Sequence, residues 1–274
     1  MSTLKAGVIG WPIEQSKSPI LHGYWLEQNS IDGVFSKIAA TPEDFEATVR
    51  RLMADGWRGS SVTLPHKGAA MAVADEVTAS AKAIGAANTL IFDGGRIISD
   101  NTDWFGFIEN LMDRAGDQWR SDEPVMIFGA GGAARAAIFA LIDAGVPEIR
   151  LLNRTKSKAE TLAEVFGPKV VVHDWENQQA ALKGAALIVN TTSLGMIGQP
   201  PLEIDFSDAP SHAVATDAVY VPLETPFLKS AAKAGLTTVD GLGMLIHQGR
   251  PSFRTWFGAE PTVDDTLRQL LLNA

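Results

Sequence analysis

A glycine-rich segment in the middle of the chain sets its architecture: Val125-Met126-Ile127-Phe128-Gly129-Ala130-Gly131-Gly132-Ala133-Ala134-Arg135-Ala136. Four apolar residues lead into a glycine cluster and then into an alanine-rich amphipathic segment, which predicts a strand, a tight turn and a helix. In Gly129-x-Gly131-x-x-Ala134, the first glycine permits the turn and the second lets the backbone approach a phosphate. A strand-to-helix turn without a ligand is the alternative.

Composition bounds the class of protein. With 274 residues, 46 % of them hydrophobic and 20 % charged, the chain is expected to form two globular domains. The net charge of −9, with no basic block, argues against a nucleic-acid partner and favours a small molecule. There is no cysteine, and the five histidines form no H-x-H or H-x-x-x-H pair, so we expect no metal site.

The beginning of the chain bears on its location. Residues 1–13 reach an acid, Glu14, too early for a signal peptide, and the longest apolar helical segment is interrupted by Asp143. We therefore expect a cytoplasmic protein without a membrane partner. The sequence leaves open whether it is a monomer or a homodimer.

The first part of the chain predicts an α/β domain with an open mixed sheet. Pro19 falls in the first turn of a helix with Ser18 as its N-cap, and Thr41 caps a second helix with Pro42 at its first position. Asp93-Gly94-Gly95 predicts a hairpin turn. Strands are expected at residues 4–11, 34–39, 59–64 and 89–92, with a partner strand ending near 99, and helical segments at 68–84.

Polar residues follow these strands. Lys67 lies just beyond the carboxyl end of the strand at 59–64, where open α/β sheets bind ligands, although a solvated surface lysine is the alternative. Asp103 stands at a strand-to-helix junction and has a plain helix cap as its alternative, as do Ser16 and Ser18.

The second part predicts a Rossmann-like domain. Its second strand, 148–152, ends in Asn153-Arg154-Thr155, where an NAD site would carry an acid for the ribose 2′-hydroxyl. Arg154 suits a 2′-phosphate instead, and Lys156 and Lys158 add positive charge, which favours NADP. Ordinary basic residues near a helix end are the alternative. Further strands are expected at 170–172, 187–189, 214–220 and 237–239, a helix at 224–234, and closing helices that return to the first domain.

Taken together, the motifs resemble the shikimate dehydrogenase family over essentially the whole chain. The matching segments are Ser16-x-Ser18-Pro19, Val62-Thr63-x-Pro65-x-Lys67, Gly85-Ala86-x-Asn88-Thr89, Asn101-Thr102-Asp103, Gly129-Ala130-Gly131-Gly132-Ala133, Asn153-Arg154-Thr155, Asn190-Thr191-Thr192, Tyr220 and Gly241-Leu242-Gly243-Met244-Leu245-x-x-Gln248.

The resemblance implies an NADP-dependent enzyme that interconverts 3-dehydroshikimate and shikimate in aromatic amino-acid biosynthesis. It implies a substrate-binding domain of residues 1–103 and 240–274 and an NADP-binding domain of residues 104–239. The substrate residues it implies are Ser16, Ser18, Ser61, Thr63, Asn88, Asp103, Tyr220 and Gln248. The cofactor residues it implies are Gly129, Ala130, Gly131, Gly132, Ala133, Asn153, Arg154, Thr155, Lys158, Thr191, Ala218, Gly241 and Met244.

Lys67 and Asp103 are the catalytic pair that the resemblance implies. As hydride leaves the carbinol carbon, a proton leaves its oxygen, so a group that accepts and returns a proton must be within hydrogen-bond reach. Partial burial lowers a lysine's pKa and a nearby carboxylate raises it, so the residues themselves leave open which of the two holds the proton. By resemblance, Lys67 is the proton acceptor and Asp103 its partner.

Three segments depart from the family's pattern. Ser61 replaces a usual asparagine, Ser99-Asp100 replaces a commoner glycine and an uncharged residue, and Gly249-Arg250-Pro251 stands where small alanines are usual. These departures bear on the substrate: quinate, an aminoshikimate or another cyclic polyhydroxy acid is the alternative. A non-catalytic NADP-binding regulator is a further alternative, which the pair Lys67 and Asp103 argues against.

Overall fold

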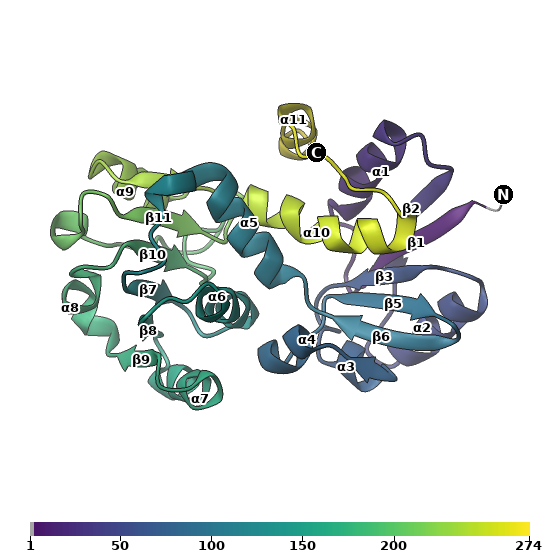
Figure 1. The fold of residues 1–274 in the computed structure, drawn as a ribbon, viewed down its shortest axis with the longest axis horizontal. Helices are drawn as coiled ribbons and strands as arrows, with labels where there is room; N and C mark the ends of the chain where they lie inside the picture. Colours follow the sequence, from purple (N-terminus) through teal and green to yellow (C-terminus); the bar gives the residue numbers. More distant parts are fainter. Residues whose placement is uncertain (1–2) are drawn as a thin grey trace. The chain divides into compact units, whose positions relative to one another are not determined.

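The computed structural model describes residues 3–274 (Figure 1). The chain divides into two compact units, residues 3–102 with Ile246–Ala274, and Asp103–Leu245. Asp103 and residues 240–245 were expected in the first domain, whereas their contacts group them with the second unit. One reason is close packing: a Cβ on Gly241 would lie 2.6 Å from the carbonyl oxygen of Ala218.

The sheet of the first unit is mixed, as predicted, and its six strands have the order β2-β1-β3-β5-β6-β4. β1 pairs in parallel with β2 and β3, β5 is antiparallel to β3 and β6, and β4 is parallel to β6. The strands are β1 (Leu4–Gly10), β2 (Gly33–Ala39), β3 (Gly59–Val62), β4 (Glu76–Val77), β5 (Thr89–Asp93) and β6 (Arg96–Asp100).

The unpredicted β4 lies within a segment expected to be helical. The backbone N–H of Asp75 donates to the carbonyl of Ile97 at 2.8 Å, and that of Thr78 donates to the carbonyl of Ser99 at 3.0 Å. These bonds to β6 are made over long sequence separations, so they override the local helical pattern.

The helices that complete the first unit are α1 (Ser18–Gln28), α2 (Phe45–Ala54), α3 (Ala69–Ala72), α4 (Ala79–Ile84), α10 (Leu242–Phe257, from Ile246 on) and α11 (Asp265–Leu272). Two predicted caps are wrong. Ser18 is the first residue of α1, which no side chain caps. α2 begins at Phe45 because the Thr41 hydroxyl bonds the carboxylate of Asp44 at 3.0 Å and the Asp44 N–H at 3.3 Å, forming a turn before the helix.

The second unit contains a fully parallel sheet in the order β12-β11-β10-β7-β8-β9. Alternate strand residues face opposite layers: Val125 and Ile127 pack with α5, α6 and α7, and Met126 and Phe128 pack with α8 and α9. The strands are β7 (Val125–Phe128), β8 (Ile149–Leu152), β9 (Val170–His173), β10 (Leu187–Asn190), β11 (Val214–Asp217) and β12 (Thr237–Val239).

The helices of this unit flank the parallel strands (Figure 1). The α-helices are α5 (Asp103–Ala115), α6 (Gly132–Asp143), α7 (Lys156–Phe166), α8 (Gln178–Leu182) and α9 (Pro226–Lys233), with 3-10 turns at η1 (Gly116–Gln118), η2 (Trp175–Asn177) and η3 (Phe206–Asp208). β11 ends three residues earlier than predicted, because the Asp217 carboxylate accepts a bond from the N–H of Val219 at 2.9 Å and turns the chain.

Among residues 3–274, no helix combines the length and apolar character that crossing a bilayer requires.

His22 lies at the centre of an aromatic cluster in the first unit. Its ring stacks on Phe35 with centroids 3.9 Å apart and lies near Trp25, Phe253 and Trp256. Both ring nitrogens are buried without a hydrogen-bond partner. Because burial strongly disfavours the charged ring, the pKa of His22 is lowered from 6.5 to about 3.

This pKa shift predicts acid sensitivity. Between pH 6.5 and 3 the unfolded chain binds a proton at His22 that the folded chain does not, so the free energy of unfolding falls as the pH falls. At pH 5, His22→Phe is expected to remove a penalty of about 2 kcal/mol that is absent at pH 7. Urea unfolding at both pH values measures it, with the half-buried His173→Gln as control. The prediction would be contradicted if the free energies of unfolding of His22→Phe and wild type differed by the same amount at pH 5 and at pH 7.

Candidate functional site

The glycine-rich turn lies at the carboxyl edge of the parallel sheet. β7 is paired with β8 on one side and β10 on the other, so the strand order reverses beside it, and ligands of open α/β sheets bind at such a point. Gly129 has φ +109°, and a Cβ there would lie 2.5 Å from Oγ1 of Thr191. Thr191 itself donates from its N–H and its hydroxyl to the carbonyl of Phe128, at 2.8 and 2.6 Å. The turn is therefore tightly packed on the end of β10.

The start of α6 is built differently. Gly131 occupies the N-cap without a side-chain cap, and the first turn contains no acid. Gly131 and Gly132 are exposed, and a Cβ at either would meet no atom within 4 Å. The first N–H groups of a helix have no intrahelical partner and attract anions. This uncapped start, with open space before it, fits the pyrophosphate of a dinucleotide.

The turn after β8 contains the predicted cations. The Asn153 side chain donates to the carbonyl of Thr155 at 2.7 Å, which folds the turn, and Arg154, Thr155 and Lys158 are exposed. Thr155 is at the N-cap of α7 but its side chain accepts no cap bond. Lys156 is 2.6 Å from Asp174, whose hydrogen bond and charge raise the lysine's pKa. Arg154 is exposed in this turn, so its guanidinium is accessible to the 2′-phosphate of a dinucleotide.

A buried carboxylate organises the ends of β10 and β11. Asp217 accepts hydrogen bonds from the Asn190 amide at 3.0 Å and the Thr225 hydroxyl at 2.6 Å, in addition to Val219 N. Burial is the largest influence on its pKa and raises it. Asn190 in turn accepts bonds from the backbone and hydroxyl of Thr192, at 3.0 and 2.7 Å. Asp217 was not among the predicted site residues, although an acid within an apolar strand is a signal visible in the sequence.

Other predicted residues of the second unit lie near these strand ends. Ala218 follows β11 directly and packs against Gly241. Tyr220 is half-buried, which raises the pKa of its phenol. Met244, on α10, is partly buried and packs against the apolar core that contains Val239.

In the first unit, two of the predicted substrate residues, Thr63 and Asn88, lie at one edge of the mixed sheet. β3 and β6 run in the same direction and β5 in the opposite one, so Thr63 after β3, Asn88 before β5 and Thr102 after β6 share that edge. The carbonyl of half-buried Lys67 accepts a bond from Ala87 N at 2.9 Å, which places this loop next to Asn88.

Asn88 joins several of these segments through its side chain. It is buried, its Oδ1 accepts bonds from Thr102 N at 2.8 Å and the Thr89 hydroxyl at 3.0 Å, and its Nδ2 donates to Gln248 Oε1 at 3.3 Å. Asn88 and Gln248, 160 residues apart, are therefore brought together. Ser16, which follows β1, accepts a bond from Ser18 N at 3.4 Å.

Comparisons with known proteins agree with this geometry. Three family models match: the shikimate dehydrogenase substrate binding domain at residues 8–90, shikimate / quinate 5-dehydrogenase at 112–197, and the shikimate 5′-dehydrogenase C-terminal domain at 241–271. A relative from Rhodospirillum rubrum, named shikimate dehydrogenase (NADP(+)), is 50 % identical over 97 % of this chain and 96 % of its own. The chain belongs to the shikimate dehydrogenase family.

Solved structures of this family share the fold. Shikimate 5-dehydrogenase from Thermus thermophilus, in complex with NADP(H) and shikimate, is 34 % identical, with a TM-score of 0.86 over 98 % of this chain and 99 % of that one. Quinate dehydrogenase from Corynebacterium glutamicum, in complex with NAD, is 29 % identical, with a TM-score of 0.91 over 99 % of both chains. The predicted α/β class, with a mixed-sheet domain and a Rossmann-like domain, is confirmed.

The structure shows what two residues of the departures from the family pattern, Asp100 and Gly249, contact. The Asp100 carboxylate accepts bonds from the Thr78 and Ser80 hydroxyls, both at 2.6 Å, and so ties β6 to the start of α4. Gly249 faces α1, where a Cβ would lie 2.9 Å from Leu21 and 3.1 Å from Trp25. Both residues therefore have a local packing or anchoring role. Ser61 is buried in β3, in register with Val8 and Thr89.

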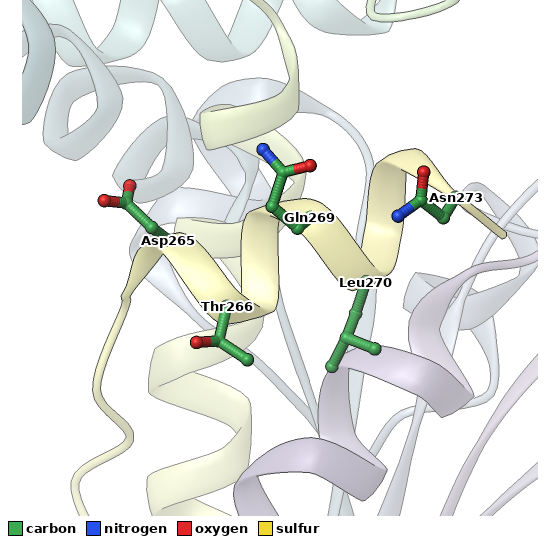
Figure 2. Close-up of a pocket in the computed structure, with 5 residues that line it drawn as sticks. All are labelled: Asp265, Thr266, Gln269, Leu270 and Asn273. Atoms are coloured by element: carbon green, nitrogen blue, oxygen red, sulfur yellow. The ribbon is translucent and has the colours of Figure 1, made fainter.

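A shallow hollow of about 380 Å³ lies elsewhere, along one face of α11 (Figure 2). Its lining residues all come from that helix and its C-terminal end, and none is a predicted site residue: Asp265, Thr266, Gln269, Leu270 and Asn273. Within residues 3–274, no three His, Cys, Asp or Glu side chains gather as a metal site.

Substitution by alanine is expected to change the free energy of unfolding differently at Gly129 and at Gly132. Gly129→Ala should lower the free energy of unfolding by more than about 1 kcal/mol, because φ is positive and the new methyl group meets Thr191. Gly132→Ala should leave it unchanged or raise it, since alanine fits a helix and the space is open. Urea unfolding without cofactor measures both. Equal losses in the two variants would contradict these assignments.

Proposed function

We propose that this protein is an NADP-dependent oxidoreductase that interconverts 3-dehydroshikimate and shikimate in aromatic amino-acid biosynthesis. The observation that carries the proposal is the 50 % identity, over nearly all of both chains, to a relative named shikimate dehydrogenase (NADP(+)). The uncapped glycine turn and the Asn88 edge support it, since a dinucleotide and a polyhydroxy acid need such sites. We further propose that the enzyme acts in the cytoplasm as a monomer or homodimer.

The proposed assignment of roles follows the motif positions. Most of the proposed substrate residues belong to the first unit, and Asp103 and Tyr220 belong to the second, which binds NADP through the turns that follow β7, β8, β10 and β11. The substrate's carboxylate and hydroxyls are recognised by the residues Ser16, Ser18, Ser61, Thr63, Asn88, Asp103, Tyr220 and Gln248. The cofactor is held by Gly129, Ala130, Gly131, Gly132, Ala133, Asn153, Arg154, Thr155, Lys158, Thr191, Ala218, Gly241 and Met244.

Proton transfer is assigned to Lys67. Bound NADP supplies the hydride acceptor, or the hydride donor in its reduced form. In the oxidation of shikimate, the neutral Lys67 amine takes the hydroxyl proton as the carbon becomes a ketone. In the reverse direction, the Lys67 ammonium stabilises the developing alkoxide and then returns the proton. Asp103, next to the anchored Thr102, is the partner that orients the ammonium.

The activity is tested by following NADPH optically. Wild type should reduce 3-dehydroshikimate, and Lys67→Ala should lower kcat by roughly 10²–10⁴-fold while changing the substrate KM much less. Lys82→Ala, on the exposed side of α4, is the matched control.

The oxidation assay separates the alternatives. Turnover of quinate in preference to shikimate would replace the substrate assignment. NADPH binding without turnover of either acid would point to a regulator instead of an enzyme.

Cofactor preference gives an independent prediction. Arg154→Ala should raise the KM for NADPH by roughly 10- to 100-fold, because a charge-assisted bond to the 2′-phosphate is lost, and leave the KM for NADH unchanged. Lys156→Ala should change neither value by as much, since this lysine is already bonded to Asp174. A wild-type preference for NADH would overturn the role of Arg154.

A further inference from the structure

The orientation of the buried Asn88 amide is dictated by a backbone group. Thr102 N lies 2.8 Å from one end of this amide, and a peptide N–H can only donate. That end must therefore be Oδ1, and the other end must be the amino group Nδ2. Asn88 is 3 % exposed, so water does not compete for these positions.

The same logic sets the direction of the hydroxyl chain beside it. Thr89 Oγ1 lies 3.0 Å from Asn88 Oδ1, an acceptor, so Thr89 uses its single proton there. Thr89 Oγ1 also lies 3.0 Å from Ser252 Oγ, and it can only accept in this second bond. The Ser252 hydroxyl therefore donates to Thr89, and the Thr89 hydroxyl donates to Asn88. Both hydroxyl residues are at most 2 % exposed.

The amino end of Asn88 then orients Gln248. Nδ2 donates to Gln248 Oε1 at 3.3 Å and to the Thr102 hydroxyl at 3.0 Å. With its oxygen turned to Asn88, the Gln248 amide has its amino group on the opposite side. Gln248 and Ser252 lie four residues apart, on one face of α10, so a single helix supplies the first and last members of the network.

We propose that Thr89 and Ser252 are positioning residues for substrate binding: they lock the Asn88 amide and, through it, hold Gln248 so that it presents a hydrogen-bond donor to a substrate oxygen. This inference rests on the proposed substrate role of Asn88 and Gln248. It adds that recognition at Gln248 requires an acceptor on the ligand, and that the amide, whose direction Thr102 N sets, is held in place by buried hydroxyls which do not touch the substrate.

The test removes the Thr89 hydroxyl at nearly constant volume. Thr89→Val should raise the KM for shikimate roughly five- to tenfold, with kcat within about twofold and the KM for NADP unchanged. Thr89→Ser should restore the wild-type KM. Ser252→Ala should shift it in the same direction by less, because Thr89 can still donate. Thr48→Val, a buried hydroxyl on α2, is the control for destabilisation alone.

A double-mutant cycle tests the route through Gln248. In a Gln248→Ala background, Thr89→Val should shift the KM clearly less than in wild type. Equal shifts in both backgrounds, or a Thr89→Ser variant as impaired as Thr89→Val, would overturn the proposal. If Thr89→Val does not fold, an unchanged shikimate KM in Ser252→Ala overturns it in the same way.

A readout without substrate separates this inference from the proposed function. In ligand-free protein, Thr89→Val should shift the side-chain NH₂ resonances of Asn88 and Gln248 in ¹H–¹⁵N spectra, and Thr48→Val should not. Unmoved resonances would refute the positioning role even in an active enzyme. If the resonances move in Thr89→Val but the wild-type protein does not turn over shikimate, the positioning role stands and only the proposed activity is refuted.

Discussion

A buried side-chain amide at a strand end holds the loops of each unit in place. Asn88 performs this task before β5, and Asn190 performs it at the end of β10. Each accepts hydrogen bonds from a backbone N–H and a hydroxyl nearby, and each donates to a side chain brought from elsewhere, Gln248 or Asp217. An amide suits this role because it joins donors and acceptors without burying a net charge.

The two amides differ in the partners that these bonds give them. Asn88 bonds to neutral groups on Thr89, Thr102 and Gln248, which fix its direction. Asn190 bonds to the Asp217 carboxylate, which also accepts from Thr225, the N-cap of α9. One buried acid thus links the end of β10, the end of β11 and the start of a helix, and its elevated pKa reflects the burial this requires.

Sequence patterns were sufficient where structure depends on near neighbours. The strand, turn and helix at residues 125–136 and the hairpin at Asp93-Gly94-Gly95 follow from apolar runs and glycines, and the structure contains them. Patterns failed at β4, which depends on pairing with the distant β6. They also failed locally at Thr41, where two competing short-range structures were possible and a turn with Asp44 formed in place of the helix cap. The contacts of Asp100 with α4 and of Gly249 with α1 could not be read from the sequence, because both join segments far apart in the chain.

The division of the chain also has a consequence for biosynthesis. The second unit is one continuous segment, Asp103–Leu245, whereas the first needs residues 3–102 together with Ile246–Ala274. On the ribosome, the early segment therefore emerges without the tryptophan, serine and glutamine of α10 that bond to β5 and the asparagine before it. All the strands of the first unit are synthesised before those of the second, yet the second unit, being continuous, can complete its packing before residues 246–274 have been added to the first.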